Sequence, residues 1–174
     1  LLRQAGPRLR GKRIVIDPGH GGPDRGVTVA GVTEAELMWD LARRLEGRMA
    51  ATGMEALLTR REDACPAEAE RATFANAAGA DIVLSLHVDA NHSMHAEGLA
   101  TFHFGSGSGI TSTVGEALAG YIHRELTSRT AMLDLGTQAR TWELLRLTRM
   151  PTVRVEIGYL TNMGDRRRLL DPVF

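Results

Sequence analysis

The chain has few of the features that mark proteins built on disulfides or on nucleic-acid binding. Cys65 is the one cysteine among 174 residues, so no internal disulfide can form. A lone thiol does not decide between export and retention, because many exported proteins also lack disulfides. Basic and acidic residues number 21 each, which gives a formal net charge of zero. This balance provides no overall positive field, so we expect no nucleic-acid partner.

Long apolar runs and targeting signals are also missing. No stretch of 18 or more apolar residues occurs, so we expect no membrane insertion. Residues 1–12 have no signal-peptide pattern and no initiator Met, and we expect them to be a linker or the end of an upstream segment. The length favours a single domain with its own core, and the absence of long heptads makes a monomer the default expectation.

Strand-like and helix-like segments alternate along the chain. This alternation predicts an α/β fold, a single domain with a central mixed, mainly parallel sheet of about six strands flanked by helices. The segment 21–32 is rich in glycine and is expected to be an irregular loop near the site. Expected strands cover 13–17, 54–59, 81–87, 98–104 and 152–157, with a short strand or turn at 144–147. Expected helices begin after Thr33 and at 67–78, 113–129 and 163–170.

Three of the expected strands lead to a polar residue at their carboxyl ends. His20 follows an apolar run that stops at Pro and Gly, His87 ends a second such run, and Glu156 ends a third. We therefore expect these side chains at the carboxyl-terminal edge of the sheet. A lone histidine at a strand end is more often structural, so the argument depends on the whole set.

Glu34 completes the set from a helix. Thr33 and Glu36 have the spacing of a capping box, which predicts that Thr33 begins the helix and Glu36 is its reciprocal partner. Glu34 then lies in the first turn, where the helix dipole favours a carboxylate that can point toward the sheet edge. A role in capping alone is the competing interpretation. Two histidines, a glutamate and a further carboxylate suit catalytic zinc, which needs three N/O ligands, an open position and a base.

The amino-acid sequences of these segments resemble those of the zinc-dependent N-acetylmuramoyl-L-alanine amidases. The resemblance covers roughly residues 13 to 172 and rests on Ile16–Gly22, Glu34, Ser85–Ala90 and Val155–Asn162. It implies that His20, Glu34 and His87 bind Zn²⁺ and that Glu156 is the catalytic carboxylate. It also implies hydrolysis of the amide between N-acetylmuramic acid and L-alanine in peptidoglycan or a muropeptide. Residues 13–174 would be the catalytic domain, with a truncated C-terminus.

A second function stays open. Trp39–Ala50 and Arg140–Val153 resemble actinobacterial amidase-like proteins that act in the cytoplasm to regulate peptidoglycan precursor synthesis. Such a regulator would be catalytically silent and would bind a protein partner. An active amidase would instead work in the cell envelope or outside the cell. The chain keeps all four residues of the set, which favours a working metal site, and the short 21–32 loop predicts an open groove.

The remaining histidines are expected to lie outside the site. His92 and His95 are interpreted as solvated loop residues, His103 as a residue on the solvent side of a strand, and His123 as part of a helix face. Trp142 is expected to pack against the fold, with a place beside a glycan groove as the alternative.

Overall fold

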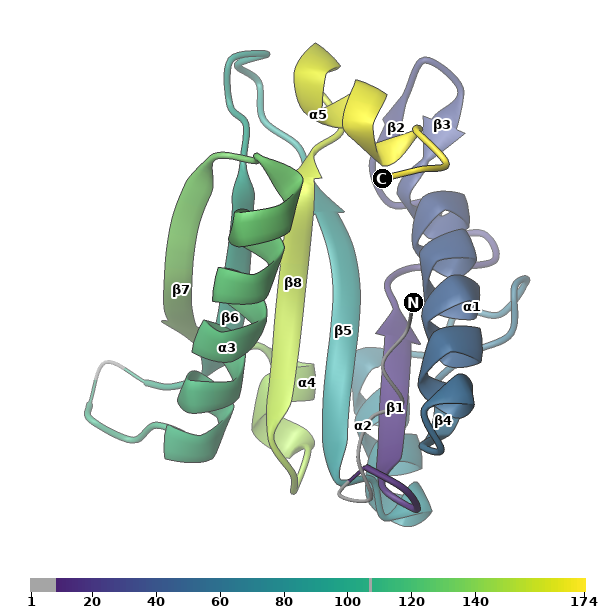
Figure 1. The fold of residues 1–174 in the computed structure, drawn as a ribbon, viewed down its shortest axis with the longest axis vertical. Helices are drawn as coiled ribbons and strands as arrows, with labels where there is room; N and C mark the ends of the chain where they lie inside the picture. Colours follow the sequence, from purple (N-terminus) through teal and green to yellow (C-terminus); the bar gives the residue numbers. More distant parts are fainter. Residues whose placement is uncertain (1–8, 107) are drawn as a thin grey trace.

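The computed structural model describes residues 9–106 and 108–174, and residues 1–8 of the expected linker lie outside this part. The described chain forms one six-stranded sheet with the order β4-β1-β5-β8-β6-β7 (Figure 1). All neighbouring pairs are parallel except β6 and β8, so the expected mixed, mainly parallel sheet is confirmed. The strands are β1 (Arg13–Pro18), β4 (Glu55–Leu58), β5 (Ile82–Asp89), β6 (Leu99–Phe104), β7 (Asp134–Arg140) and β8 (Thr152–Tyr159).

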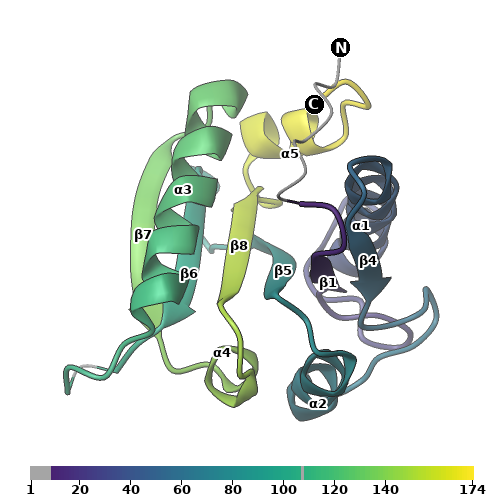
Figure 2. The same cartoon turned by 60° about the horizontal axis from the view of Figure 1, so that its bottom comes forward.

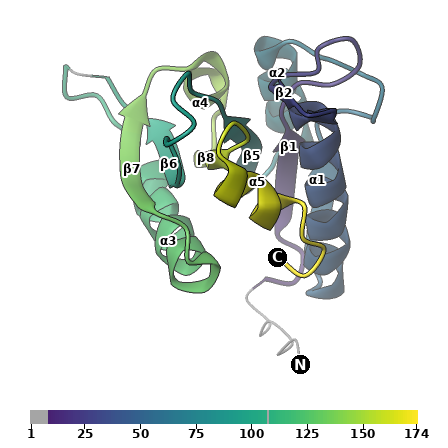
Figure 3. The same ribbon diagram turned by 90° about the horizontal axis from the view of Figure 1, so that it is seen from above.

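Helices cover both faces of the sheet. Figures 2 and 3 show α1, α3 and α5 on one face and α2 and α4 on the other. The two longest helices divide the first face, because α1 packs on β1, β4 and β5 whereas α3 packs on β6, β7 and β8. No helix in the described part of the chain has the length and apolar character that crossing a membrane requires. The helices are α1 (Glu34–Ala51), α2 (Glu68–Ala78), α3 (Thr113–Thr130), α4 (Glu143–Leu147) and α5 (Met163–Leu169).

The central strands divide their side chains between these two faces. Along β8, Val153, Val155 and Ile157 belong to the core beneath α1 and α3. The alternate residues Arg154 and Glu156 therefore face the α2 and α4 side, because successive side chains of a strand point in opposite directions. An apolar cavity of about 360 Å³ lies on the first face, between α1, α3 and α5. The four polar residues singled out in the sequence do not line it.

In the second half of the chain one strand was missed and one prediction is wrong. The sixth strand is β7 at Asp134–Arg140, and residues 143–147 form the short helix α4 in place of a strand or turn. Edge strand β7 has almost no apolar alternation and contains Gly136, so its sequence carries no strand signal. In α4 the adjacent residues Leu144 and Leu145 are both buried, which a half-exposed strand would not allow.

The segment before α1 is more ordered than expected. Residues Thr28–Val29 (β2) and Val32–Thr33 (β3) pair as a small antiparallel hairpin within the expected loop. Thr33 caps α1 as predicted, with its side chain accepting from the backbone N–H of Glu36. The reciprocal half of the capping box is wrong, because the Glu36 carboxylate pairs with Arg25.

Candidate metal centre

The sheet places three of the four polar residues on neighbouring strands. His20 follows the end of β1, His87 lies in β5, and Glu156 lies in β8 directly opposite His87 in the register. All three are near the carboxyl ends of parallel strands, where α/β folds commonly form sites. The strands of His87 and Glu156 run slightly further than predicted, to Asp89 and Tyr159.

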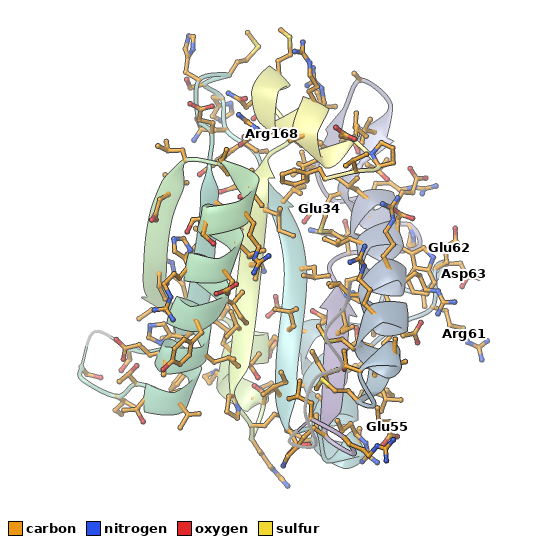
Figure 4. All side chains as sticks on the ribbon, in the orientation of Figure 1. Glu34, Glu55, Arg61, Glu62, Asp63 and Arg168 are labelled. Carbon is orange, nitrogen blue, oxygen red and sulfur yellow. The ribbon has the colours of Figure 1, made fainter. Side chains whose placement is uncertain are left out.

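Glu34 reaches the same place from the N-terminus of α1. Its Oε1 atom lies 2.9 Å from Nδ1 of His87, and its Oε2 atom lies 3.1 Å from Nε2 of His20. Backbone N–H groups of Val27 and Val88 donate to the same carboxylate at 3.0 and 3.2 Å. Figure 4 shows Glu34 between α1 and β5, near the carboxyl end of β5. The helix start thus aims this carboxylate at the two imidazoles.

The three side chains fit a zinc ion. One ligand atom from each of His20, Glu34 and His87 lies within 4.8 Å of the others. Two imidazole nitrogens and a carboxylate oxygen are a common ligand set of catalytic zinc. Asp24 Oδ2 lies 2.8 Å from Nδ1 of His20, the arrangement that orients metal-binding histidines in proteins. The His20 side chain is 28% exposed, so the cluster is reachable from solvent.

The buried negative charge of Glu34 favours a cation in the cluster. Burial opposes ionisation of Glu34, but hydrogen bonds to His20 and His87 outweigh it and hold the pKa of the Glu34 carboxyl well below its ordinary value. The hydrogen bond between His20 and the Glu34 carboxylate raises the pKa of His20 to about 9. Burial opposes this rise, and the hydrogen bond and charge of Asp24 add to it. A carboxylate that is only 1% exposed is stable only beside positive charge, which a proton or a metal ion can supply.

Two glycines leave room for the cluster. A Cβ atom on Gly19 would lie 2.2 Å from the His87 ring. Gly26 has a positive φ of 62°, and a Cβ there would lie 2.6 Å from Oε2 of Glu34 and 2.7 Å from the His20 ring. Larger residues at these positions would displace the polar side chains.

Two buried arginines hold the chain that carries His20. Arg60 donates to the carbonyl groups of Pro18 and Gly19, while Arg71 donates to those of Pro18 and His20. These contacts secure His20 in its left-handed conformation, at a φ of 57°. Contacts to backbone carbonyls leave no pattern in a sequence, so this arrangement could not be found there.

Glu156 lies beside the cluster with one oxygen engaged and one free. Arg154 donates to Oε1 from Nε at 2.8 Å, and its Nη2 atom lies 2.6 Å from the same oxygen. Oε2 is buried and has no hydrogen-bond partner among the described residues. Burial raises the pKa of the Glu156 carboxyl, and the charge of Arg154 offsets this only in part. The sequence pointed to Glu156 but missed Arg154, although both follow from the alternation of β8.

The other histidines lie elsewhere. His92 and His95 are exposed loop residues, as predicted. His103 was expected on the solvent side but is only 5% exposed, because α3 covers its face of β6. His123 is also buried, and its Nε2 atom lies 2.6 Å from Asp134 of β7. None of the four belongs to the cluster of His20, Glu34 and His87, whose side chains could hold a metal ion.

Comparisons with known proteins place these features in context. Residues 14–174 match the family model described as N-acetylmuramoyl-L-alanine amidase. The chain is 53% identical over 174 aligned positions to N-acetylmuramoyl-L-alanine amidase CwlM of Mycobacterium tuberculosis, covering 98% of this chain and 43% of that protein. It is 32% identical to N-acetylmuramoyl-L-alanine amidase LytC of Bacillus subtilis, covering 94% and 32%. The chain thus spans less than half the length of these relatives.

Solved structures share the fold. The catalytic domain of CwlV, an amidase of Bacillus (Paenibacillus) polymyxa var. colistinus, superposes with a TM-score of 0.83 at 26% identity, over 92% of this chain and 87% of that one. The CwlD amidase of Clostridioides difficile, solved in complex with the GerS lipoprotein, has a TM-score of 0.78 at 21% identity, over 92% and 89%.

Proposed function

The chain belongs to the N-acetylmuramoyl-L-alanine amidase family, and from this membership we propose that it hydrolyses the amide between N-acetylmuramic acid and L-alanine in peptidoglycan or muropeptides. We assign Zn²⁺ as its cofactor, with His20, Glu34 and His87 as the ligands and Glu156 as the catalytic carboxylate. The observation that carries this proposal is the convergence of two imidazoles and one carboxylate within 4.8 Å, next to a buried Glu156 oxygen without a partner.

The chain's own residues supply the binding, orientation and proton transfer. Bound zinc would lower the pKa of a coordinated water and polarise the scissile carbonyl. Oε2 of Glu156 accepts a proton from the attacking water while the water oxygen bonds to the lactyl carbonyl carbon. The same atom then delivers the proton to the alanine nitrogen as the C–N bond breaks. Burial makes the Glu156 carboxylate a stronger base than an exposed glutamate, which suits this exchange.

Asp24 and the arginine contacts prepare the His20 side of the site. The Asp24 carboxylate fixes the orientation of the His20 ring, and Arg71 holds the His20 carbonyl group at 2.8 Å. A ligand that is fixed before the metal arrives loses less conformational freedom on binding. These contacts hold the backbone of His20 at its left-handed φ of 57°.

The proposed activity places the protein where peptidoglycan is, in the cell envelope or outside the cell. The second candidate is a silent regulator with this fold that acts through a protein partner in the cytoplasm. The GerS complex of the CwlD amidase supports the idea that proteins with this fold can bind partners. The retained cluster and the free Glu156 oxygen favour the amidase over the regulator.

A digestion assay separates the two functions. Purified peptidoglycan and a soluble muramoyl peptide are incubated with the zinc-supplemented protein, and release of peptides with a free L-alanine amine is scored. The parent protein is expected to release such peptides. Glu156→Gln is expected to keep stoichiometric zinc and lose turnover by roughly 10² to 10⁴-fold, the usual contribution of a general acid–base group.

A ligand variant completes the test. His87→Ala is expected to lose zinc, because two protein ligands hold the metal poorly. Stoichiometric zinc in His87→Ala would refute the ligand assignment, and loss of zinc in Glu156→Gln would mean that Glu156 is itself a ligand. No release from either substrate by the zinc-loaded parent protein would refute the amidase proposal in favour of the regulator.

A further inference from the structure

Arg154 makes the closest contacts to the proposed catalytic carboxylate. It precedes Glu156 by two residues in β8, so both side chains extend from the same face of the strand. Two of its nitrogen atoms, Nε and Nη2, lie 2.8 and 2.6 Å from Oε1 of Glu156. Both nitrogens therefore engage a single carboxylate oxygen, while Oε2 has no partner in the described part of the chain.

Other side chains fix the guanidinium in turn. The Arg154 guanidinium carbon lies 4.4 Å from the centroid of the Trp142 ring, and Trp142 packs on Phe102 with centroids 4.7 Å apart. Glu68 of α2 lies 3.8 Å from Nη1 of Arg154. The Arg154 side chain is only 20% exposed. A planar guanidinium that is stacked on an aromatic ring and flanked by two carboxylates has little freedom to rotate.

This arrangement decides which oxygen of Glu156 is available. A glutamate carboxylate can exchange its two oxygens by rotation about its last side-chain bond, a torsion with a broad energy profile. Anchoring Oε1 through two donors opposes that rotation and keeps Oε2 as the free atom. Glu156 also lies opposite His87 in the sheet register, so the anchored carboxylate stays beside the metal-binding group.

We propose that Arg154 is the positioning residue of Glu156, which holds Oε1 so that Oε2 remains free for proton transfer, and that Trp142 and Glu68 hold Arg154 for this task. The proposal deepens the amidase function given above and rests on it. It predicts that Arg154 acts on turnover and leaves zinc binding and substrate affinity largely intact.

Three variants test the proposal in the zinc-loaded protein. Arg154→Met removes the charge and both donors, while Arg154→Lys keeps the charge but loses the planar pair of donors. Arg140→Met is the matched control, because the Arg140 guanidinium also stacks on Trp142, at 5.9 Å, but donates its hydrogen bonds to Ala139 and Gln138 rather than to Glu156. Values of kcat and KM are measured on a muramoyl peptide, together with zinc stoichiometry and melting temperature.

A change in kcat with little change in KM is expected. Arg154→Met should lower kcat by roughly 10²-fold, the effect of misplacing a catalytic group by about 1 Å. Arg154→Lys should recover only part of this loss, and Arg140→Met should match the parent protein. Wild-type kcat in Arg154→Met, or a rise in kcat, would overturn the proposal. Full recovery by Arg154→Lys would also overturn it, because charge neutralisation alone would then suffice.

A crystal structure of Arg154→Met gives a readout that does not depend on activity. The Glu156 carboxylate is expected to leave its position or to occupy two orientations. An unmoved carboxylate with a single orientation would refute the positioning role even if the parent protein proved to be inactive. If Arg154→Met does not fold, Arg154→Lys and Trp142→Leu take its place, and both are expected to show a partial loss of order at Glu156. If the parent protein has no activity but Glu156 is displaced in these variants, the amidase function is refuted and the positioning role of Arg154 still holds.

Discussion

Replacing Arg71 by Met is expected to be among the most destabilising single changes in this protein. The Nη1 atom of Arg71 lies 2.8 Å from Oδ1 of Asp17, and the two side chains are 5% and 2% exposed. Removal of one partner of a buried ion pair leaves an uncompensated charge and costs about 3–5 kcal/mol. For a domain of this size each kcal/mol corresponds to about 2–4 °C, so the melting temperature should fall by roughly 6–20 °C.

Urea unfolding of four proteins measures this effect. The parent, Asp17→Asn, Arg71→Met and the double variant form a thermodynamic cycle. The loss of unfolding free energy in the double variant should be smaller than the summed losses of the two single variants. The reason is that no unpaired buried charge remains when both Asp17 and Arg71 are replaced. A loss of stability below about 1 kcal/mol in Arg71→Met would refute the reasoning, because breaking a buried ion pair costs about 3–5 kcal/mol. Strict additivity in the cycle would also refute it, because residues in contact normally show a coupling energy.

The same pair predicts the direction of a pH effect. Burial disfavours the ionised Asp17 carboxyl, but the charge of Arg71 and hydrogen bonds from Thr59, Arg71 and Ser85 outweigh it, so the pKa of Asp17 is below its ordinary value. A lowered pKa in the folded state adds stability that is present above the unfolded pKa of about 3.9. That contribution disappears as the pH falls through the lower folded pKa. The stability difference between the parent and Asp17→Asn should therefore shrink below about pH 4.

Two further predictions concern the metal centre. Free zinc at 100 times its dissociation constant should stabilise the parent by about 2.7 kcal/mol, which is roughly 5–11 °C in melting temperature. A chelator should reverse this shift. An equal shift in His87→Ala would contradict the proposed metal site. Gly26→Ala should weaken zinc binding by about tenfold or more, because its Cβ would lie 2.6 Å from a Glu34 oxygen. Gly31→Ala is the matched control, since Gly31 also has a positive φ but nothing lies within 4 Å of the added Cβ. Equal zinc affinities for the two alanine variants, measured by competition with a chelating dye, would show that the close approach at Gly26 is unimportant.

The sequence predicted the elements whose signals are local. The apolar runs of β1, β5 and β8 are buried on both faces, and such strands stand out in any parallel sheet. The start of α1 was readable because Thr33 satisfies a backbone N–H three residues away. Edge strand β7 was missed because its order comes from pairing with β6 rather than from its own residues. His103 was placed wrongly because the covering helix α3 comes later in the chain.

The same division holds for the candidate site. The sequence by itself determined the residue types of the set, since His20, His87 and Glu156 each follow a readable apolar run and Glu34 follows a readable cap. Only the tertiary structure decided which atoms meet. Glu34 and His87 are 53 positions apart in the chain, and Arg71 and Asp17 are 54 apart. Contacts at such separations depend on the order of strands in the sheet and on the helix that packs over it, and neither leaves a periodic pattern in the residues themselves.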